Sequence, residues 1–413
     1  MPSALLGASS VGADELEALC KVVENRNLFR HYGLGKSHFA DDFEALLRSY
    51  FEVPYALGLT SCSAALQCAW AALGIGPGDE VVLPAFSWFS CYNSIVLAGA
   101  TPVFCEIDRS MNLDADHLRE KLNSKTKAVL VVHYQGSAAN LEAIKGLLDP
   151  GGIALVEDVA QAMGGSLNGR KLGTVGDIGV FSMQGNKILS TGEGGFLLCK
   201  DARIFERAVR FHDLGILREV FAAQLPSELG IVADSSGGFS GLQFRISEVT
   251  AAMGIAQFAK LDGMISKCRK WWHRLRSNLE QRLPGISFRQ SYDLAGDLGI
   301  TMFIDFGSGE KARLFSQAYN AEGLRVGPSS GMVNLLHLDY VKQRRMPHPA
   351  MPPFAKGQPG EAVRYSPADC PETDGILSAM VAIAVGPLYS EADFIDIENG
   401  IVKACSGLGL FEG

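Results

Sequence analysis

The chain has 413 residues, of which 47% are hydrophobic and 20% charged. This composition is typical of a globular protein that buries a substantial core, and the length predicts two domains. The formal net charge of −8 supplies no basic stripe, which argues against binding to a nucleic-acid backbone.

Neither a membrane span nor a zinc site is expected. The uncharged stretch 81–104 could cross a bilayer by length, but proline, glycine and polar residues interrupt it. The nine cysteines include no C-x-x-C pair, so free thiols in a reducing compartment are expected. The start of the chain, MPSALLGASS, lacks the basic and apolar regions of a signal peptide, and the expected location is the cytoplasm.

Between residues 54 and 200, short apolar runs alternate with helix-length segments. The runs predict strands at 55–59, 80–84, 101–107, 127–133, 153–158, 178–183 and 194–199, and the segments predict helices at 62–73, 87–98 and 139–147. Near-continuous apolar strands separated by helices indicate an α/β fold with a largely parallel sheet covered on both faces. Ligands of such folds bind beyond the carboxyl ends of the strands.

The pattern changes after a strongly helical stretch at 245–280. Strands at 286–290 and 298–307, with helices at 310–322 and 391–404, predict a smaller α+β domain. The segment 324–370 has many Pro, His and Met residues and few periodic features. We expect it to form functional loops that decide which substrate binds.

Lys187 is the single lysine in the stretch FSMQGNKILSTGEGGFLLC, between a strand-like run and a glycine cluster. Burial lowers the pKa of a lysine, and a neutral amine is a nucleophile suited to Schiff-base chemistry. For one lysine taken alone, a surface turn is the simpler interpretation.

Two further features change that balance. Asp158 ends a buried strand, where it could cap the next helix or pair with a buried cation. The sequence TSCSAAL (60–66) opens a helix whose free N–H groups form an anion site, to which Ser182 could add a hydroxyl. An anion site, a carboxylate and a reactive lysine are together what pyridoxal 5′-phosphate (PLP) requires.

The chain also contains six motifs whose combination and order along the sequence are specific to one protein family. They are SCSAAL, PAFSWFSCYNSI, VHYQG, EDVAQAMGG, FSMQGNKILSTGEGG and FRISEVTAAMGIAQFAKLD. Over roughly residues 13–280 the chain resembles the DegT/DnrJ/EryC1/StrS family of PLP-dependent sugar aminotransferases. The resemblance implies PLP-transferase fold type I, with a mostly parallel central sheet flanked by helices and a smaller α+β C-terminal domain. It also implies three parts: an N-terminal helical arm (1–25) on the small domain, a large PLP-binding domain (26–262) and a small domain (263–413).

The resemblance implies roles for the residues that face the cofactor ring. Lys187 matches the lysine that bonds to PLP and later moves protons, and Asp158 matches the carboxylate on the pyridine nitrogen. Gln161 falls at the position that contacts the PLP hydroxyl, and Trp88 where an aromatic ring stacks on the cofactor. Each of the last two has an alternative, since Trp88 could be plain core and Gln161 a surface amide.

The hydroxyl of Ser182 and the backbone amides of Cys62 and Ser63 match the groups that bind the PLP phosphate in the family. The usual Ser-Gly-Thr of this loop reads Ser-Cys-Ser here, so Cys62 lacks glycine's freedom at positive φ. Gln243 stands where the family has an asparagine that contacts the phosphate from the second subunit, which puts that contact in doubt.

Four more residues are weaker candidates for substrate contacts. Arg245 matches a segment that reaches the partner's active site, although it could instead pair with Glu248 on its own helix. Arg30 and His31 fall in a region near the substrate cleft of the family. His212 is equally compatible with a local turn and with the edge of the cleft.

Two nucleotide sites are disfavoured. GLGKS (33–37) looks like the end of a phosphate-binding P-loop, but Arg30 stands where that motif needs glycine. No glycine-rich dinucleotide fingerprint follows the first strand, which argues against an NAD enzyme.

The function implied is a homodimeric aminotransferase with active sites at the subunit interface. It would pass an amino group from glutamate or glutamine through pyridoxamine 5′-phosphate to a ketone. The acceptor would be a keto-sugar, nucleotide- or phosphate-linked, or a cyclitol, in amino-sugar or natural-product biosynthesis. Alternatives are another PLP reaction such as dehydration, a non-catalytic PLP-binding regulator on the same scaffold, and a non-enzymatic binding module.

Overall fold

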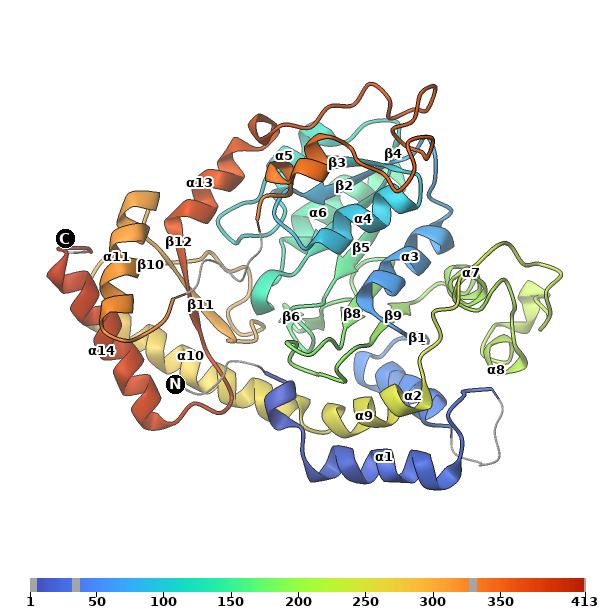
Figure 1. The fold of residues 1–413 in the computed structure, drawn as a ribbon, viewed down its shortest axis with the longest axis horizontal. Coiled ribbons are helices and arrows are strands. Elements are labelled where there is room, and N and C mark those ends of the chain that lie inside the picture. The colour runs from blue at the N-terminus through green and yellow to red at the C-terminus, as the bar shows by residue number, and fades with distance from the viewer. Residues whose placement is uncertain (1–5, 32–37, 327–332, 412–413) are drawn as a thin grey trace.

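The computed structural model describes residues 6–31, 38–326 and 333–411. At its centre lies a seven-stranded sheet with the order β1-β9-β8-β5-β4-β2-β3 (Figure 1). The strands are β1 (Tyr55–Leu59), β2 (Glu80–Pro84), β3 (Thr101–Cys105), β4 (Thr126–Val132), β5 (Ala154–Asp158), β8 (Ile178–Ser182) and β9 (Gly195–Cys199). All seven predicted strands are confirmed, because each apolar run is long enough to cross the sheet and is stopped by polar or glycine residues.

Strand direction brings the functional positions to one edge. β3, β2, β4, β5 and β8 are mutually parallel, whereas β9 is antiparallel to both of its neighbours, β8 and β1. β1 therefore points the same way as the parallel strands. The carboxyl ends of β1, β5 and β8, at Leu59, Asp158 and Ser182, meet along the same edge.

Both faces of the sheet are buried, and the side-chain alternation of β4 shows how. Val129 and Val131 pack into one apolar cluster with α2 (Phe39–Phe51) and α6 (Leu141–Leu148). Leu130 and Val132 point the opposite way into a second cluster with α3 (Cys62–Leu73), α4 (Phe89–Leu97) and α7 (Ala202–His212). A strand covered on both sides must be apolar at every position, which explains its uninterrupted hydrophobic sequence.

A smaller α+β unit follows. The helices α9 (Glu248–Phe258) and α10 (Leu261–Arg282) lead to an antiparallel sheet of β10 (Ser287–Phe288), β11 (Thr301–Asp305) and β12 (Met380–Ala384). Its separate core includes Trp272 of α10 and Phe315 of α11 (Gly309–Ala321), with α14 (Glu391–Gly407) on the same side. Strand β12 was not among the predicted strands.

The remaining described elements are short or peripheral. They are α1 (Ala13–Asn25), α5 (Ala115–Lys121), β6 (Ser166–Leu167), β7 (Arg170–Lys171), α8 (Glu219–Ala222), α12 (Asp339–Lys342) and α13 (Pro371–Ala379), together with several single 3-10 turns.

The N-terminal arm contacts a different partner from the one expected. Helix α1 packs along α9, inside the range assigned to the large domain, and not on the three-stranded sheet (Figure 1). An ion pair joins the two: Lys260 Nζ, on a side chain that is 24% exposed, lies 2.7 Å from Oε1 of Glu15, whose side chain is 1% exposed. Burial alone would raise the pKa of Glu15, but Lys260 and the N–H of Gly12 hold it below the ordinary value.

The described part of the irregular segment, 333–370, covers the large sheet's α4 and β3 side. Leu335 N–H donates to Ala85 O at 2.8 Å, and the Tyr365 hydroxyl donates to Pro102 O at 2.7 Å. These residues were assigned to the small domain by sequence, yet their apolar side chains join the cluster around α3 and α4.

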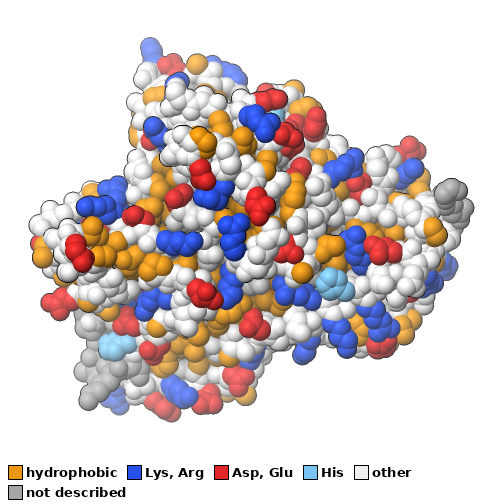
Figure 2. Space-filling model, turned by 180° about the vertical axis from the view of Figure 1, so that it is seen from behind, with side chains coloured by type: hydrophobic (Ala, Val, Ile, Leu, Met, Phe, Trp, Pro, Cys, Tyr) orange, Lys and Arg blue, Asp and Glu red, His pale blue; other side chains and the backbone are white. Residues whose placement is uncertain are grey.

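The surface carries its charge in a mixed pattern. On the face shown in Figure 2, basic and acidic side chains are interspersed, with hydrophobic groups between them. Within the described residues, every helix is too short or too polar to cross a bilayer.

One buried ion pair is expected to matter for stability. Arg30 Nη1 donates to Glu44 Oε1 at 2.6 Å, and the same oxygen accepts from Gly58 N–H at 2.7 Å, with both side chains 1% exposed. Glu44→Ala leaves the guanidinium without its buried partner, so we expect the free energy of unfolding to fall by about 3–5 kcal/mol in urea titrations. Glu17→Ala removes an exposed partner of Lys21 and serves as the control, with no measurable loss expected. Equal effects of the two substitutions would contradict the assignment.

Candidate active site

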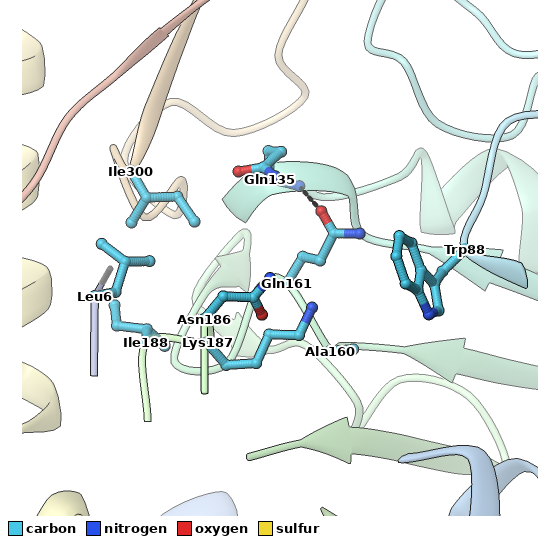
Figure 3. A pocket seen from close by; sticks show the side chains of 9 residues that line it. All are labelled: Leu6, Trp88, Gln135, Ala160, Gln161, Asn186, Lys187, Ile188 and Ile300. Carbon is cyan, nitrogen blue, oxygen red and sulfur yellow. Dashed lines mark hydrogen bonds between the residues drawn. The ribbon is translucent and has the colours of Figure 1, made fainter. Parts of the chain in front are cut away.

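A cavity of about 370 Å³ opens at the carboxyl edge of the large sheet. It is lined by Ser61, Cys62, Ser63, Trp88, Ser90, Asp158, Ala160, Gln161, Ser182, Gln184, Asn186, Lys187 and Glu193. An adjoining cavity of about 80 Å³ shares five of these residues and adds Leu6, Gln135, Ile188 and Ile300 (Figure 3). The seven residues assigned to the reactive amine, ring and phosphate therefore lie together, although they come from four separate stretches of sequence.

Lys187 lies in the loop between β8 and β9, where its N–H donates to Gln184 O at 2.9 Å. In Figure 3 its amine extends into the cavity towards Ala160 and Gln161. Burial lowers the pKa of Lys187, and the nearby carboxylate of Asp158 opposes this in part. At a given pH, more of this amine is neutral than in an exposed lysine. The surface-turn interpretation of Lys187 does not fit this placement.

Asp158 ends β5 with its side chain in the cavity and 3% of the residue exposed. Its Oδ1 accepts from Ala160 N–H at 2.9 Å, and its Oδ2 lies 3.4 Å from the thiol of Cys91. Burial raises the pKa of Asp158, while those donors and Lys187 offset part of the rise. A buried carboxylate with a raised pKa is stabilised in its charged form by a cationic partner, such as a protonated ring nitrogen.

The preceding residue, Glu157, has a structural role that sequence reasoning missed. Its carboxylate is fully buried and accepts from the N–H groups of Gly173 at 2.8 Å and Gly176 at 2.6 Å. Its Oε2 also lies 2.9 Å from His133 Nε2. Burial would raise the pKa of Glu157, but His133 and these amides hold it below its usual range. The end of β5, and with it Asp158, is thereby fixed.

The start of α3 forms a cradle of N–H groups that can hold an anion. Ser61 caps the helix, with its Oγ accepting from Ala64 N–H at 3.1 Å. The N–H groups of Cys62 and Ser63 lie in the first turn, where a helix offers them no acceptor, at the positive end of its dipole. The hydroxyl of Ser182 lines the same cavity. This arrangement suits an anion.

The Gly-to-Cys departure at position 62 carries no backbone penalty. Cys62 is the first residue of α3, and it is not among the residues with positive φ, so the freedom of glycine is not needed there. Its thiol is buried, and burial, followed by the charge of Asp158, raises its pKa well above the ordinary value. The thiol therefore stays neutral beside the amine.

Trp88 and Gln161 both line the two cavities. Trp88 is 49% exposed, which contradicts the interpretation of this ring as plain core. Gln161 Oε1 accepts from Gln135 N–H at 3.4 Å, which holds the amide over the cavity rather than out on a helix surface (Figure 3). Both side chains border the cavity into which the amine of Lys187 extends.

Arg30, His31 and His212 do not line either cavity, so the expected substrate contacts find no support within the described residues. The guanidinium of Arg30 is occupied by Glu44 and Asp41. Burial lowers the pKa of His31 to about 4 and that of His212 to about 3, so both rings are neutral near pH 7. Arg30 is 2% exposed, His212 is fully buried and the His31 side chain is 6% exposed, so burial keeps all three away from a substrate.

Arg245 and Gln243 also lie outside the lining. Arg245 forms an ion pair with Asp213, and not with Glu248 as the alternative supposed. Gln243 is exposed and forms an antiparallel bridge with Asp213. The P-loop-like stretch 33–37 lies outside the described residues, and the described part of 324–370 contributes nothing to the lining.

The comparison of the whole sequence with family profiles gives one match. The DegT/DnrJ/EryC1/StrS aminotransferase family matches residues 12–321. The chain belongs to this family. The membership expected from the six motifs is therefore confirmed.

Two relatives in this aminotransferase family show how far the likeness extends. The chain is 34% identical over 245 residues to the GDP-perosamine synthase of Vibrio cholerae, which covers 59% of this chain but 63% of that protein. It is 31% identical over 387 residues to the L-glutamine:2-deoxy-scyllo-inosose aminotransferase of Streptoalloteichus tenebrarius, covering 91% of this chain and 87% of that protein. The first alignment thus spans less than two thirds of the relative's length.

Solved structures agree on the architecture. The aminotransferase TlmJ from Streptoalloteichus hindustanus superimposes with a TM-score of 0.77 at 26% identity, over 97% of this chain and 98% of that one. A 3-amino-5-hydroxybenzoic acid synthase superimposes with a TM-score of 0.78 at 23% identity, over 96% and 97% of the two chains. The expected fold class, with its mostly parallel sheet and smaller α+β domain, is confirmed.

The cofactor of this family is PLP, and the site fits it. The start of α3 offers amides to a phosphate, Asp158 faces the cavity as a buried carboxylate, and Lys187 supplies the amine. The fit extends to the backbone beneath the cradle: a Cβ on Gly195 would lie 2.5 Å from Ser61 C and 2.6 Å from Cys62 N. Glycine is thus what allows β9 to pass directly under the cradle.

Sequence reasoning also missed several lining residues. Asn186 and Glu193 lie inside the quoted motif around Lys187, so their nearness to Lys187 in the sequence was the available signal. Leu6 and Ile300 lie far from any motif, and no local pattern could have placed them in the site.

We expect Gly195→Ala to weaken PLP binding about tenfold, comparable to the loss of one hydrogen bond of ~1.4 kcal/mol, because the new methyl group displaces the cradle amides. Titration of the cofactor-free protein with PLP measures this dissociation constant. Gly263→Ala is the matched control, since a Cβ there meets nothing within 4 Å. An unchanged constant in Gly195→Ala would exclude the start of α3 as the phosphate site.

Proposed function

We propose that this chain is a PLP-dependent aminotransferase that moves an amino group from glutamate or glutamine to a ketone of a keto-sugar or cyclitol. The observation that carries the proposal is a single cavity at the carboxyl edge of the sheet. It holds an anion-binding helix start, a buried carboxylate and a half-buried amine with a lowered pKa. PLP requires that combination of groups.

Bound PLP supplies the electron sink for the transfer. Lys187 would hold it through the side-chain nitrogen, and the same amine would move protons at the reacting carbon. Asp158 would keep the ring nitrogen protonated by offering it a negative partner. The amides of Cys62 and Ser63, with the hydroxyl of Ser182, would anchor the phosphate, and Trp88 would contact the ring.

The names of the relatives narrow the substrates. One relative is named for a GDP-linked amino sugar, and the other for an amino transfer from L-glutamine to a cyclitol ketone. The second relative aligns over most of both chains, which supports including free cyclitol ketones beside nucleotide- or phosphate-linked keto-sugars.

We further propose a homodimer whose active sites lie at the subunit interface. Exposed apolar side chains gather in the sequence around the Gln243 segment, at Leu214, Val220, Val232, Leu242 and Val249. Gln243 itself is exposed, and Trp88 leaves half of its surface open. A second copy would cover such surface and bring Gln243 and Arg245 towards its partner's site.

Nine free cysteines, eight of them buried, support a reducing compartment, and we propose the cytoplasm as the place of action.

The decisive experiment locates the covalent bond and then follows the amino group. Borohydride treatment with PLP followed by peptide mass mapping is expected to label Lys187, and Lys187→Ala is expected to lose the label. Lys403→Ala, an exposed lysine on α14, is the control. Glutamate or glutamine should then convert the bound cofactor to its amine form, and a panel of keto-sugars and keto-cyclitols should restore the aldehyde form.

The other possible results of the labelling and conversion experiment would each point to a different conclusion. A label elsewhere, or none, would refute the assignment of Lys187. A label on Lys187 without conversion by either donor would indicate a PLP-binding regulator. Loss of water from the substrate in place of amino transfer would indicate a dehydratase.

The charge of Asp158 predicts a pH effect. Because this carboxylate raises the pKa of Lys187 against the lowering by burial, Asp158→Asn should lower that pKa further. We expect the rate at which an amine-specific reagent modifies Lys187 in the cofactor-free protein to rise with pH through a midpoint below that of an exposed lysine. The midpoint should lie lower still in Asp158→Asn, and Asp396→Asn on α14 is the control. An upward shift would contradict the proposed electrostatic pairing.

A further inference from the structure

The loop that carries Lys187 is in contact with the beginning of the chain. Residues 6–10, here called the N-terminal strap, lie against this loop, and Gly7 N–H donates to Lys187 O at 2.8 Å. Gly7 has φ −66° and ψ −42°, which any residue can adopt. Its Cβ, however, would lie 2.7 Å from Ser190 N and 2.8 Å from the carbonyl oxygens of Ile188 and Lys187. The contact, and not the backbone conformation, requires glycine.

A buried amide ties the other end of the strap to the same loop. Gln257 is fully buried; its Nε2 donates to Ser10 Oγ at 3.1 Å, and its Oε1 accepts from Ser190 N–H at 3.4 Å. Lys260 Nζ donates to Ser10 O at 3.0 Å and pairs with Glu15. The loop from 187 to 190 is therefore held at its first residue by Gly7 and at its last by Gln257.

The first residue of the strap reaches the cavity itself. Leu6 is 8% exposed and lines the smaller cavity together with Ile188 and Ile300. In Figure 3 these three side chains lie together on one side of Lys187, while the amine points away from them towards Gln161. Three distant parts of the chain thus form one apolar wall behind the lysine, which limits water on that side.

We propose that the N-terminal strap is part of the active site, with Gly7 as the positioning residue for Lys187. Through its hydrogen bond to Lys187 O and its close packing on Ile188 and Ser190, Gly7 fixes the main chain from which the reactive amine extends. Leu6 closes the cavity behind it. The proposal rests on the proposed function only in taking Lys187 as the reactive amine.

The test compares Gly7→Ala with Gly12→Ala in the full-length protein. A Cβ at Gly12 meets nothing within 4 Å, and its φ of −165° is extended backbone, so this control changes the same region without touching the loop. Hydrogen–deuterium exchange of the cofactor-free protein reports on the amides of residues 187–191. We expect exchange there to be about tenfold faster in Gly7→Ala and unchanged in Gly12→Ala.

The second readout is the pH midpoint for modification of Lys187 by an amine-specific reagent. Gly7→Ala should move it upward, towards that of an exposed lysine, since a displaced loop lets water reach the amine. If the amide exchange and the pH midpoint of Gly7→Ala both equal those of Gly12→Ala, the proposal is overturned. A lower melting temperature of Gly7→Ala with both readouts unchanged would also overturn it, because that result marks a purely structural role. If the wild-type protein takes no PLP label on Lys187, the proposed function fails, while the exchange comparison still tests the strap.

Discussion

The site depends on two groups of opposite charge that the fold keeps away from water. Burial pushes the pKa of Lys187 down and that of Asp158 up, so each group is driven towards its neutral form, and each restores part of the other's charge. Such a pair does little for stability, because desolvation offsets the attraction. The pair matters for the chemistry, because a partly neutral amine can attack an aldehyde and a buried carboxylate is stabilised by a cation. The rest of the structure holds these two groups at one edge.

That holding is achieved by backbone amides more than by side chains. Glu157 collects the N–H groups of Gly173 and Gly176 and fixes the end of β5. The first turn of α3 presents its own amides to the cavity, and Gly195 allows β9 to pass against that turn. Because these groups belong to the main chain, the change from glycine to Cys62 leaves the cradle intact. The chemistry therefore tolerates side-chain variation at positions where the backbone supplies the contact.

The sequence predicted the parts of the fold that are locally encoded. The seven strands of the large sheet were found because both of its faces are buried, which makes each strand an unbroken apolar run. The pair of Lys187 and Asp158 was found because both follow such runs. The small domain was harder to predict, since β12 lies next to irregular sequence and is recognised only by pairing with β11. The family resemblance, rather than spacing, supplied the roles of Gln161 and Trp88.

The failures have one physical cause, which is pairing between side chains that belong to different elements of the fold. Arg30 has the chemistry of a substrate contact, but Glu44 and Asp41 take its hydrogen bonds, and a sequence does not show which carboxylates will be adjacent. The N-terminal arm was expected on the small domain, yet Glu15 meets Lys260. The same long-range pairing brings Gly7 to Lys187. The position of the reactive amine thus depends on a contact that closes a loop of some 180 residues, which no local sequence pattern reveals.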